Sequence, residues 1–471
     1  MKKVFVSGDF NILHPGHLRF LKFAKESGNH LTVGINSDLL SSNKGINQEV
    51  RLESIKATSY VDEAFILDTS AIEYIKNHKP DIVVKGKEHE NEENPELEVI
   101  ESYGGKLLFS SGEIGFSSMD LLREEFFASN YNVKHNSKYL ARHAFKLSDL
   151  KSIVDKFSNL SVLVIGDTIV DEYITCEALG MSQEDPTIVV TPLANNKFIG
   201  GAAIVASHAA TLGAKVKFIS VVGEDENKSY VQDGLDKLGI DVSLCTDTTR
   251  PTTLKQRFRA KEKTLLRVNH LKQHGISKDI ETTILKKIQD SIADIDLILF
   301  SDFSYGVLTN TLINSITKLG VKNGILMAAD SQSSSQVGDI AKFKNMSLVT
   351  PTEREIRLSL NDFKSGLVVL SNKLAENTHA KYIFTTLGAE GLMIYNNSKN
   401  ELLTDNVNAL GSVVKDVSGA GDSLLTCGAM ALCVGADIWQ SAYLGSLASA
   451  IQISRVGNVP IKKAELLKEL E

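Results

Sequence analysis

The strongest constraint on the fold is an alternation of strand-like and helix-like segments that occurs twice along the chain. The apolar run "KKVFVSG" precedes the helical pattern "HLRFLKFAKESG", and the alternation continues as far as "KLLFSS". It resumes at "LSVLVIGDTIVDEYI" and reaches the C-terminus through strands such as "IDLILFSD" and "KYIFTTLG". Strand–helix–strand repetition predicts parallel sheets with helices on their faces. We therefore expect an α/β protein.

The length and one polar stretch predict the domain organisation. A chain of 471 residues is too long for one ordinary hydrophobic core. The Asn-rich stretch "FFASNYNVKHNSKYLARHAF" separates the two alternating series and has few strand signals. We predict an N-terminal domain over residues 1–127, a linker over 128–145 and a larger domain over 146–471.

Composition excludes several classes of protein. The net charge of −7 argues against a general nucleic-acid binder. No apolar run has membrane-spanning length, and "MKKVFVSGDF" predicts a first strand rather than a signal peptide. The cysteines Cys176, Cys245, Cys427 and Cys433 lack metal-ligand spacing, which fits a reducing compartment. We expect a cytoplasmic protein with neither nucleic acid nor membrane as a partner.

The first candidate site is "FNILHPGH", in the first strand-to-helix loop. Gly16 lies between His14 and His17 and permits close approach of the backbone to a ligand. A helix that starts here directs free N–H groups and its positive dipole end to the same place. Two imidazoles can donate hydrogen bonds to phosphate oxygens there. The alternatives are an exposed histidine pair or an adventitious metal site.

Further motifs accompany this loop: "NSDLLSSNKG", "NQEVRLESI", "DIVVKGKEHE" and "GEIGFSSMD". In this order they resemble the HxGH nucleotidyltransferases over residues 3 to about 125, including bifunctional heptose enzymes and glycerol-phosphate cytidylyltransferases. The resemblance implies that a sugar phosphate attacks the α-phosphorus of ATP or CTP, with Mg²⁺, and releases pyrophosphate. It implies catalytic roles for His14, His17 and Lys44. The nucleotide-binding residues that it implies are Gly8, Phe10, Gly16, Asp38, Arg51, Lys85, Ser117 and Ser118.

The second candidate site is "DVSGAGDSLLT". Gly419, Ala420 and Gly421 are small and precede a helical pattern, so their N–H groups can form an anion hole. Asp422 would lie at the same helix start, where a carboxylate can accept the proton of an attacking hydroxyl. The alternative is a glycine-rich turn in which Asp422 is a simple helix N-cap.

This motif follows "VLVIGDTIVDEY", "FIGGAAIVASHAATLGA", "LVTPTEREI" and "TTLGAEG". The set resembles the ribokinase-like, or PfkB-type, sugar kinases over residues 146–467, and most closely the heptose-phosphate kinases. The resemblance implies ATP-dependent phosphorylation of a sugar or sugar phosphate, with Asp422 as general base. For the other positions it implies sugar contacts by Asp171, Gly200 and Gly201, nucleotide contacts by Gly388, Gly391, Gly419, Ala420 and Gly421, an Mg²⁺ contact by Glu355 and a monovalent-cation contact by Asp416.

Several positions depart from these families. Ile204 stands where the kinases usually have a sugar-contacting asparagine, and an isoleucine cannot hydrogen-bond a hydroxyl. Thr352 stands where "TPNxxE" has asparagine, and Met119 where the nucleotidyltransferases tend to have threonine. In the bifunctional heptose enzymes the kinase half comes first, whereas here it is second. The departures leave open the sugar, the base and the strength of the kinase.

The sequence therefore predicts a bifunctional enzyme that makes a nucleotide sugar, such as ADP-heptose, for a surface glycan. The expected partners are sugar phosphates, nucleotides and further copies of the chain in a homodimer or higher homo-oligomer. Two hypotheses remain as alternatives. In one, the C-terminal half is a catalytically weak sensing or oligomerisation module. In the other, the N-terminal half transfers a cytidylyl group to a polyol phosphate.

Overall fold

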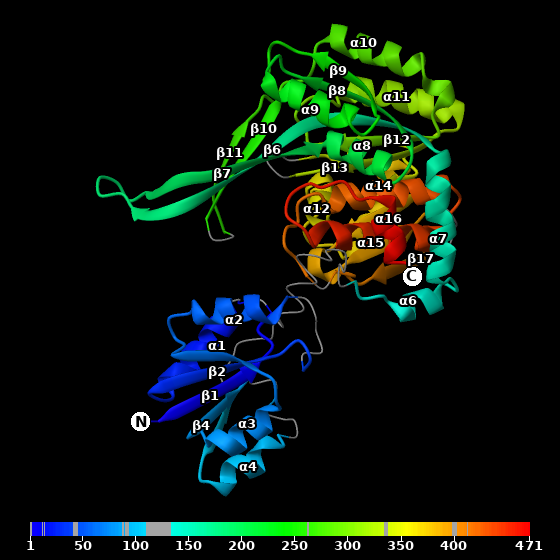
Figure 1. Cartoon of the computed structure of the whole chain (residues 1–471). Helices are drawn as coiled ribbons and strands as arrows, with labels where there is room; N and C mark the ends of the chain where they lie inside the picture. Colours follow the sequence, from blue (N-terminus) through cyan, green and yellow to red (C-terminus); the bar gives the residue numbers. More distant parts are fainter. Residues whose placement is uncertain are drawn as a thin grey trace. The chain divides into compact units, whose positions relative to one another are not determined.

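The computed structural model describes the chain except residues 1, 12, 14, 41–45, 87–88, 90–93, 110–132, 261–262, 334–337, 398–402 and 412. The chain forms two compact units, Met1–Asn130 and Tyr131–Glu471 (Figure 1). Among the helices in the described ranges, none is long and apolar enough to cross a membrane.

The first unit is a parallel five-stranded sheet in the order β3-β2-β1-β4-β5. The strands are β1 (Lys3–Gly8), β2 (His30–Asn36), β3 (Glu63–Leu67), β4 (Ile82–Lys85) and β5 (Lys106–Phe109). The helices are α1 (Pro15–Glu26), α2 (Gln48–Lys56), α3 (Ala71–His78) and α4 (Glu96–Ser102). The strand order reverses between β1 and β4, and ligands bind α/β sheets in the crevice at such a point.

The second unit has a central sheet built around β6 (Ser161–Met181). The first part of β6 pairs in parallel with β8 (Lys215–Val222) and β12 (Leu297–Asp302). Beyond these lie β9 (Asp241–Thr246) on one side and β13 (Leu326–Ser331), β14 (Leu348–Val349), β15 (Tyr382–Thr386), β16 (Leu392–Asn396) and β17 (Leu403–Val407) on the other. The first part of β6 is apolar and fully buried because helices cover both faces.

Two sets of helices cover these faces. The face that includes Val162 and Val164 packs against α7 (Leu147–Asp155), α8 (Ala202–Thr211), α9 (Glu226–Asp236), α14 (Ala420–Cys433), α15 (Ile438–Ile453) and α16 (Lys463–Lys468). The face that includes Leu163 and Ile165 packs against α10 (Lys278–Gln289), α11 (Asn310–Asn323), α12 (Glu353–Leu360) and α13 (Leu367–Thr378). The predicted α/β architecture is therefore present in both units.

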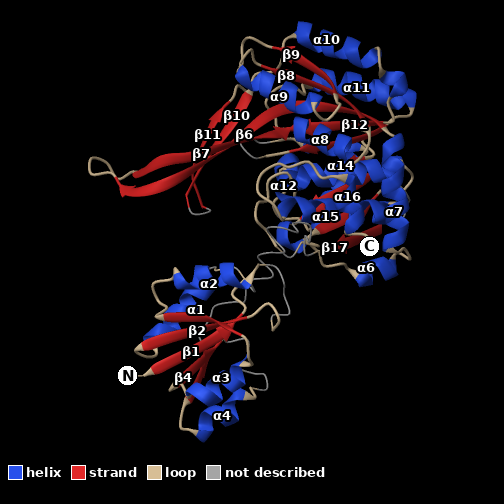
Figure 2. Cartoon of the chain, viewed as in Figure 1, coloured by secondary structure: helices blue, strands red, loops and turns tan. Residues whose placement is uncertain are grey.

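The outer part of β6 leaves the central sheet and forms an arm. It pairs with β7 (Ile188–Gly201) and β10 (Thr253–Ala260), and β10 pairs with β11 (Lys263–His270). Figure 2 shows these strands projecting from the helix-covered body of the unit. Since one strand belongs to both sheets, the arm is held directly beside the carboxyl end of the central sheet.

The stretch expected as a linker is partly folded. From residue 133 onward it packs on the second unit and contains α6 (Ser137–Arg142). The Tyr139 side chain is fully buried, and Arg142 donates to both carboxylate oxygens of Asp405, at 2.6 and 2.9 Å. The His143 ring stacks on Trp439 and the Phe145 side chain is buried in the same core, so the packing rests on a few side chains within a polar stretch. Residues 128–132 of the expected linker lie outside the described part of the chain.

Candidate functional site

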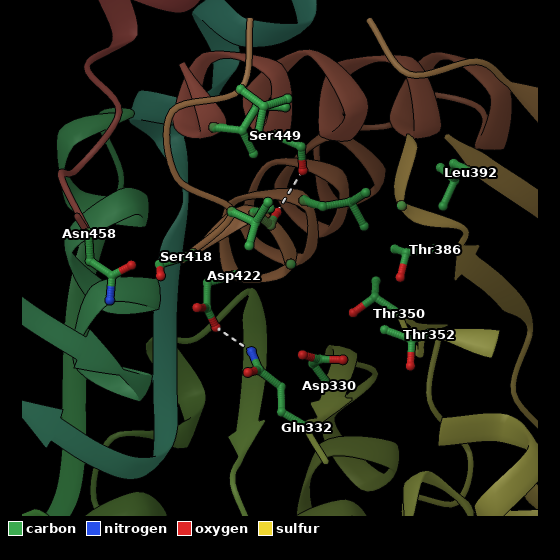
Figure 3. A pocket seen from close by; sticks show the side chains of 18 of the residues that line it. Asp330, Gln332, Thr350, Thr352, Thr386, Leu392, Ser418, Asp422, Ser449 and Asn458 are labelled. Atoms are coloured by element: carbon green, nitrogen blue, oxygen red, sulfur yellow. Dashed lines mark hydrogen bonds between the residues drawn. The ribbon is translucent and has the colours of Figure 1, made fainter. Parts of the chain in front are cut away.

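The second unit contains a cavity of about 850 Å³, a size typical of ligand pockets. It lies where the arm, the carboxyl end of the central sheet and the start of α14 meet (Figure 3). All of the residues predicted to contact sugar or nucleotide in this unit line it, except Gly200. Glu355 also lines it, whereas Asp416 does not.

The start of α14 is built by a glycine. Gly419 is the N-cap, with φ +77°, and Ala420 is the first helical residue. A Cβ on Gly419 would lie 2.7 Å from Asn458 Oδ1, so this position excludes a side chain both by conformation and by space. Asp422 lies in the first turn rather than at the N-cap. The first-turn N–H groups therefore face the cavity without a capping side chain, as an anion hole requires.

Asp422 is a buried carboxyl group with a raised pKa. Its side chain is 4% exposed, and Gln332 Nε2 donates to its Oδ1 at 3.2 Å (Figure 3). Burial raises the pKa of Asp422 to about 7, the negative charge of Asp171 adds to this, and the positive charge of Lys255 opposes it. A carboxylate with a pKa near neutrality can take a proton from a hydroxyl and release it again.

Asp171 is held by two partners at the wall of the cavity where the sugar is predicted to bind. Arg257 Nη1 lies 3.0 Å from its Oδ1, and Asn458 Nδ2 donates to its Oδ2 at 3.0 Å. A Cβ on Gly200 would lie 2.4 Å from Asp171 Oδ2, which explains the glycine. Burial raises the pKa of Asp171, although Arg257 and Lys255 act in the opposite direction.

Two of the cations that line the cavity, both on β10, were not expected from the sequence. Lys255 and Arg257 lie on one face of β10, beside Asp171 and Tyr173 of β6. The Lys255 ammonium group lies 5.0 Å from the ring centre of Phe303. Their only sequence signal is the period-two pattern "LKQRFRA", which places alternate residues on one face of a strand. That pattern is common on exposed strands, so it indicates a site only once the strand's neighbours are known.

A cluster of acidic residues faces Asp422 across the cavity. Glu355 accepts hydrogen bonds from the N–H groups of Ser333, at 2.7 Å, and Thr352, at 2.8 Å. Thr352 is the N-cap of α12 and accepts from the Glu355 N–H, so threonine keeps the capping role of asparagine. Asp330, at the end of β13, is a further member that the sequence analysis missed. The sequence indicated Asp330 only by its position at the carboxyl end of an apolar, strand-like run, where ligands bind parallel sheets.

The acidic cluster has the chemistry of a magnesium site. Burial raises the pKa of Asp330 well above its ordinary value, and the charges of Glu355 and Asp422 raise it further. A divalent cation would relieve that repulsion. Among the described residues, no set of three or more His, Cys, Asp or Glu side chains could hold a metal. Mg²⁺ nevertheless fits a site with only the two carboxylates of Asp330 and Glu355, because it keeps several waters and takes substrate phosphate oxygens as ligands.

The part of the cavity where the nucleotide is predicted to bind contains two glycines with positive φ. Gly388 has φ +61° and Gly391 has φ +98°. A Cβ on Gly391 would lie 2.1 Å from the carbonyl oxygen of Val407, so only glycine fits. The neighbouring wall is apolar and comprises Leu392, Ala409, Leu410, Val414, Ala450 and Ile453.

Asp416 lies behind the anion-hole loop. It accepts hydrogen bonds from the Tyr173 hydroxyl at 2.7 Å, the Ser418 N–H at 3.0 Å and the Gly457 N–H at 3.0 Å. Although burial acts in the opposite direction, these hydrogen bonds hold its pKa below the ordinary value. Ile204 is fully buried in α8 and lies outside the cavity lining. The place of the usual asparagine is therefore closed to a ligand.

In the first unit, the predicted loop follows β1 at the strand-order reversal. Phe10 is buried and has φ +46°, and its ring meets that of His17 at a centroid distance of 5.3 Å. A Cβ on Gly8 would lie 3.2 Å from the Phe10 ring. Gly16 and His17 are in the first turn of α1. The loop thus brings His17 to the helix start, as the motif predicts.

Arg51 differs from the predicted phosphate contact. Its side chain is 1% exposed and donates to the carbonyl oxygens of Asp9, at 2.7 Å, and Ile46, at 3.0 Å. It also donates to Asp38 Oδ1 at 2.6 Å. Its guanidinium therefore holds three loop segments together, with three of its five N–H donors bound to two carbonyl groups and one carboxylate.

Lys85 is at the end of β4, and its side chain remains partly exposed. Its Nζ lies 3.2 Å from Glu96 Oε2. His14, Lys44, Ser117 and Ser118 lie outside the described part of the chain. The candidate nucleotidyltransferase site therefore rests on Gly8, Phe10, Gly16, His17, Asp38 and Lys85, with Arg51 beneath it.

Two family models match the chain. Residues 159–463 match the pfkB family carbohydrate kinase model, and residues 5–103 match the cytidylyltransferase-like model. The first match covers the cavity of the second unit, and the second covers the loop after β1. Each candidate site thus falls within its own family match.

Curated relatives include the "Bifunctional protein HldE" of Desulfatibacillum aliphaticivorans, which is 30% identical over 323 residues, or 68% of this chain and 64% of that protein. The protein of the same name from Helicobacter hepaticus is 28% identical over 311 residues, or 65% of this chain and 63% of that protein. The chain thus spans less than two thirds of the length of these relatives.

Solved structures share the fold of the second unit. Ribokinase from Thermotoga maritima matches with a TM-score of 0.52 at 18% identity, covering 66% of this chain and 99% of that one. Phosphofructokinase-2 from Escherichia coli matches with a TM-score of 0.54 at 15% identity, covering 66% of this chain and 98% of that one. These likenesses establish a ribokinase-like fold.

Proposed function

The chain belongs to the pfkB family of carbohydrate kinases, and we propose that it is a bifunctional enzyme of nucleotide-sugar synthesis. Its second unit phosphorylates a sugar phosphate with ATP. Its first unit joins a sugar 1-phosphate to a nucleotide, giving an NDP-sugar such as ADP-heptose and pyrophosphate. The observation that carries the proposal is Asp422, buried at the open start of α14 and in the same cavity as Asp171.

In the kinase reaction, Asp422 accepts the proton of the sugar hydroxyl. That hydroxyl oxygen forms a bond to the γ-phosphorus, the bond from phosphorus to the β–γ bridging oxygen breaks, and ADP leaves. The N–H groups of residues 419–421 hold the transferring phosphoryl group through charge-assisted hydrogen bonds. Asp330 and Glu355 would hold Mg²⁺, which neutralises phosphate charge when bound.

The cations of β10 favour a phosphorylated sugar over a free sugar. Lys255 and Arg257 line the cavity beside Asp171, and the positive charges of both act on that carboxyl group. A sugar phosphate oriented by Asp171 would bring about two more negative charges to these side chains. A phosphate at the far end of the sugar would leave the acceptor hydroxyl facing Asp422. We therefore propose a heptose 7-phosphate-like substrate.

In the nucleotidyl transfer, the acceptor phosphate attacks the α-phosphorus and displaces pyrophosphate. We propose that His14 and His17 stabilise the charge on the phosphoryl oxygens, with Lys44 neutralising the leaving group and Lys85, Asp38, Ser117 and Ser118 lining the nucleotide pocket. The position of His17 at the start of α1, at the strand-order reversal, supports this. Such chemistry requires mainly positioning and charge stabilisation.

The nucleotide of the first unit has a second candidate. The family model for residues 5–103 is cytidylyltransferase-like, which favours CTP, whereas the resemblance to the bifunctional heptose enzymes favours ATP. Phosphorus NMR of the protein with ATP, CTP and a panel of heptose, hexose and polyol phosphates would decide. We expect an NDP-sugar and pyrophosphate from one nucleotide, together with phosphorylation of one sugar phosphate. Absence of both reactions would contradict the proposed function.

We also propose a monovalent cation beside Asp416. Its lowered pKa keeps this carboxylate charged at neutral pH, next to the anion-hole loop. Sugar phosphorylation should be faster in potassium than in tetramethylammonium buffer. Equal rates would argue that Asp416 serves only to brace the loop.

A homodimer joined through the arm is the oligomer that we propose. The arm exposes Leu179, Met181 and Leu193, each more than 60% accessible. Apolar side chains on an unpartnered sheet favour association. Leu193→Asp should lower the mass measured by light scattering, whereas an unchanged mass would exclude the arm. Since all proposed substrates are soluble metabolites, we propose a cytoplasmic location.

A further inference from the structure

We propose that Asn458 is a specificity-determining residue of the second unit and that its amide oxygen accepts a hydrogen bond from a hydroxyl of the sugar substrate. The inference rests on the proposed kinase function. Neither the sequence motifs nor the family resemblance pointed to this residue, which comes from the loop between α15 and α16.

The orientation of the Asn458 amide follows from its partner. Its Nδ2 donates to Asp171 Oδ2 at 3.0 Å. An ionised carboxylate can only accept hydrogen bonds, so the amide nitrogen must face Asp171 and the amide oxygen must face away from it. In Figure 3 the oxygen of Asn458 points toward Ser418, beside the anion-hole loop.

The amide oxygen lacks a partner in the structure. Asn458 is 8% exposed and lines the cavity, and its Oδ1 has no hydrogen-bond donor among the described residues. A buried acceptor without a donor costs free energy that a bound hydroxyl can recover. The amide nitrogen of Asn458 thus has a partner and its oxygen does not, as expected of a side chain whose oxygen accepts a hydrogen bond from a ligand.

The surrounding backbone leaves room for this amide. A Cβ on Gly200 would lie 3.0 Å from Asn458 Nδ2, and a Cβ on Gly419 would lie 2.7 Å from its Oδ1. The adjacent Gly457 has φ +77°, and its N–H donates to Asp416 Oδ2 at 3.0 Å. Asn458 thus lies between Asp171 and the start of α14, where the acceptor sugar must meet the transferring phosphoryl group.

Asn458 also provides the kind of side chain, an amide, that is missing at position 204. Ile204 is fully buried in α8 and outside the cavity, so no amide reaches the sugar from that helix. Asn458 supplies an amide beside Asp171 from a segment about 250 residues later in the chain. A different approach direction means that a different hydroxyl, or a different epimer, is read.

The test compares Asn458→Ala with the unaltered full chain. The assay measures ATP turnover with the sugar phosphate that the enzyme accepts and with each of its monodeoxy analogues. We expect the KM for the parent sugar phosphate to rise about five- to tenfold, as for one lost hydrogen bond, while the KM for ATP changes less than about twofold. With the analogue that lacks the contacted hydroxyl, the variant and the unaltered enzyme should differ less than about twofold.

Other outcomes would overturn the inference. An equal loss with every analogue would mean that Asn458 only positions Asp171, and a change confined to the KM for ATP would place it on the nucleotide side. Asn458→Ser, which keeps a donor for Asp171, should reproduce the analogue pattern even where the alanine variant folds poorly. Asn323→Ala, at an exposed asparagine of α11, is the matched control. No turnover by the unaltered chain would instead contradict the proposed function, and this inference would fail with it.

Discussion

The starts of α14 and α1 share one backbone feature, a glycine beside the free N–H groups of a first helical turn. The side chains around the two helix starts differ, and so does the chemistry that they can support. At α14 burial raises the pKa of Asp422 to about 7, and the negative charge of Asp171 adds to this. At α1 an imidazole packs against the Phe10 ring, above a buried guanidinium that ties the loops together. A glycine beside a helix start provides a place for phosphate. The reaction depends on side chains that arrive from distant segments.

The largest expected effect separates the two sites. Asp422→Asn should lower sugar phosphorylation by about 10²- to 10⁴-fold, the contribution of a general base, and leave pyrophosphate release unchanged. His17→Ala should have the reverse pattern. Both activities are measured on each full-length variant, with Asp233→Asn on the exposed face of α9 as the control. One substitution that abolishes both activities in a folded protein would contradict two independent sites.

A second substitution tests the buried guanidinium of the first unit. Arg51→Ala removes the ion pair with Asp38 and takes a donor away from two partly buried carbonyl groups. We expect the first unit to lose about 1–3 kcal/mol of stability, mainly through the unsatisfied carbonyl groups, with loss of nucleotidyl transfer and intact sugar phosphorylation. Thermal unfolding followed by both activities checks this. Nucleotidyl transfer weakened without any loss of stability would instead indicate the direct phosphate contact expected from the sequence.

Gly200→Ala tests the sugar side of the second unit. The added Cβ would lie 2.4 Å from Asp171 Oδ2, a side-chain atom, so the carboxylate should move while the backbone holds. We expect the KM for the sugar phosphate to rise about tenfold or more with a smaller change in the KM for ATP. Gly366→Ala is the control, because nothing lies within 4 Å of its added Cβ. Similar kinetics for the two variants would exclude the proposed role of Asp171.

The pH dependence sharpens the comparison between the two reactions. Asp422 must be deprotonated to accept a proton, so sugar phosphorylation should fall as the pH drops below its pKa of about 7. Lys255 lowers that pKa, so Lys255→Met should shift this limb of the kcat profile to higher pH. The rate of pyrophosphate release should not show this fall below pH 7. A shift to lower pH in the variant would contradict the electrostatic assignment.

The smallest effect is expected at Thr352. Asparagine and threonine both cap helices, so Thr352→Asn should change stability by less than about 1 kcal/mol and sugar phosphorylation by less than about twofold. Thr352→Ala should cost about 1 kcal/mol, because the Glu355 N–H loses the Thr352 hydroxyl that accepts its hydrogen bond at the start of α12. Kinase activity that rises strongly with Thr352→Asn would indicate that the departure from the family pattern weakens catalysis.

The sequence by itself determined the two α/β units and both helix starts. Apolar periodicity reports which faces of a helix or strand are buried, and this is a local property of the chain. Gly16 and Gly419 could be found for the same reason, since the backbone near a helix start constrains residues only a few positions apart. The fold of residues 133–145 escaped detection because its polar composition resembles that of a linker.

The tertiary structure alone decided which side chains meet. Lys255 reaches Asp171 through the parallel register of β10 and β6, and Asn458 reaches it from a loop near the C-terminus. Asp330 joins Glu355 and Asp422 through the order of the strands. Arg51 faces inward because loop carbonyl groups surround its guanidinium. Such meetings depend on strand order, register and loop closure, which long-range packing sets and no local pattern encodes.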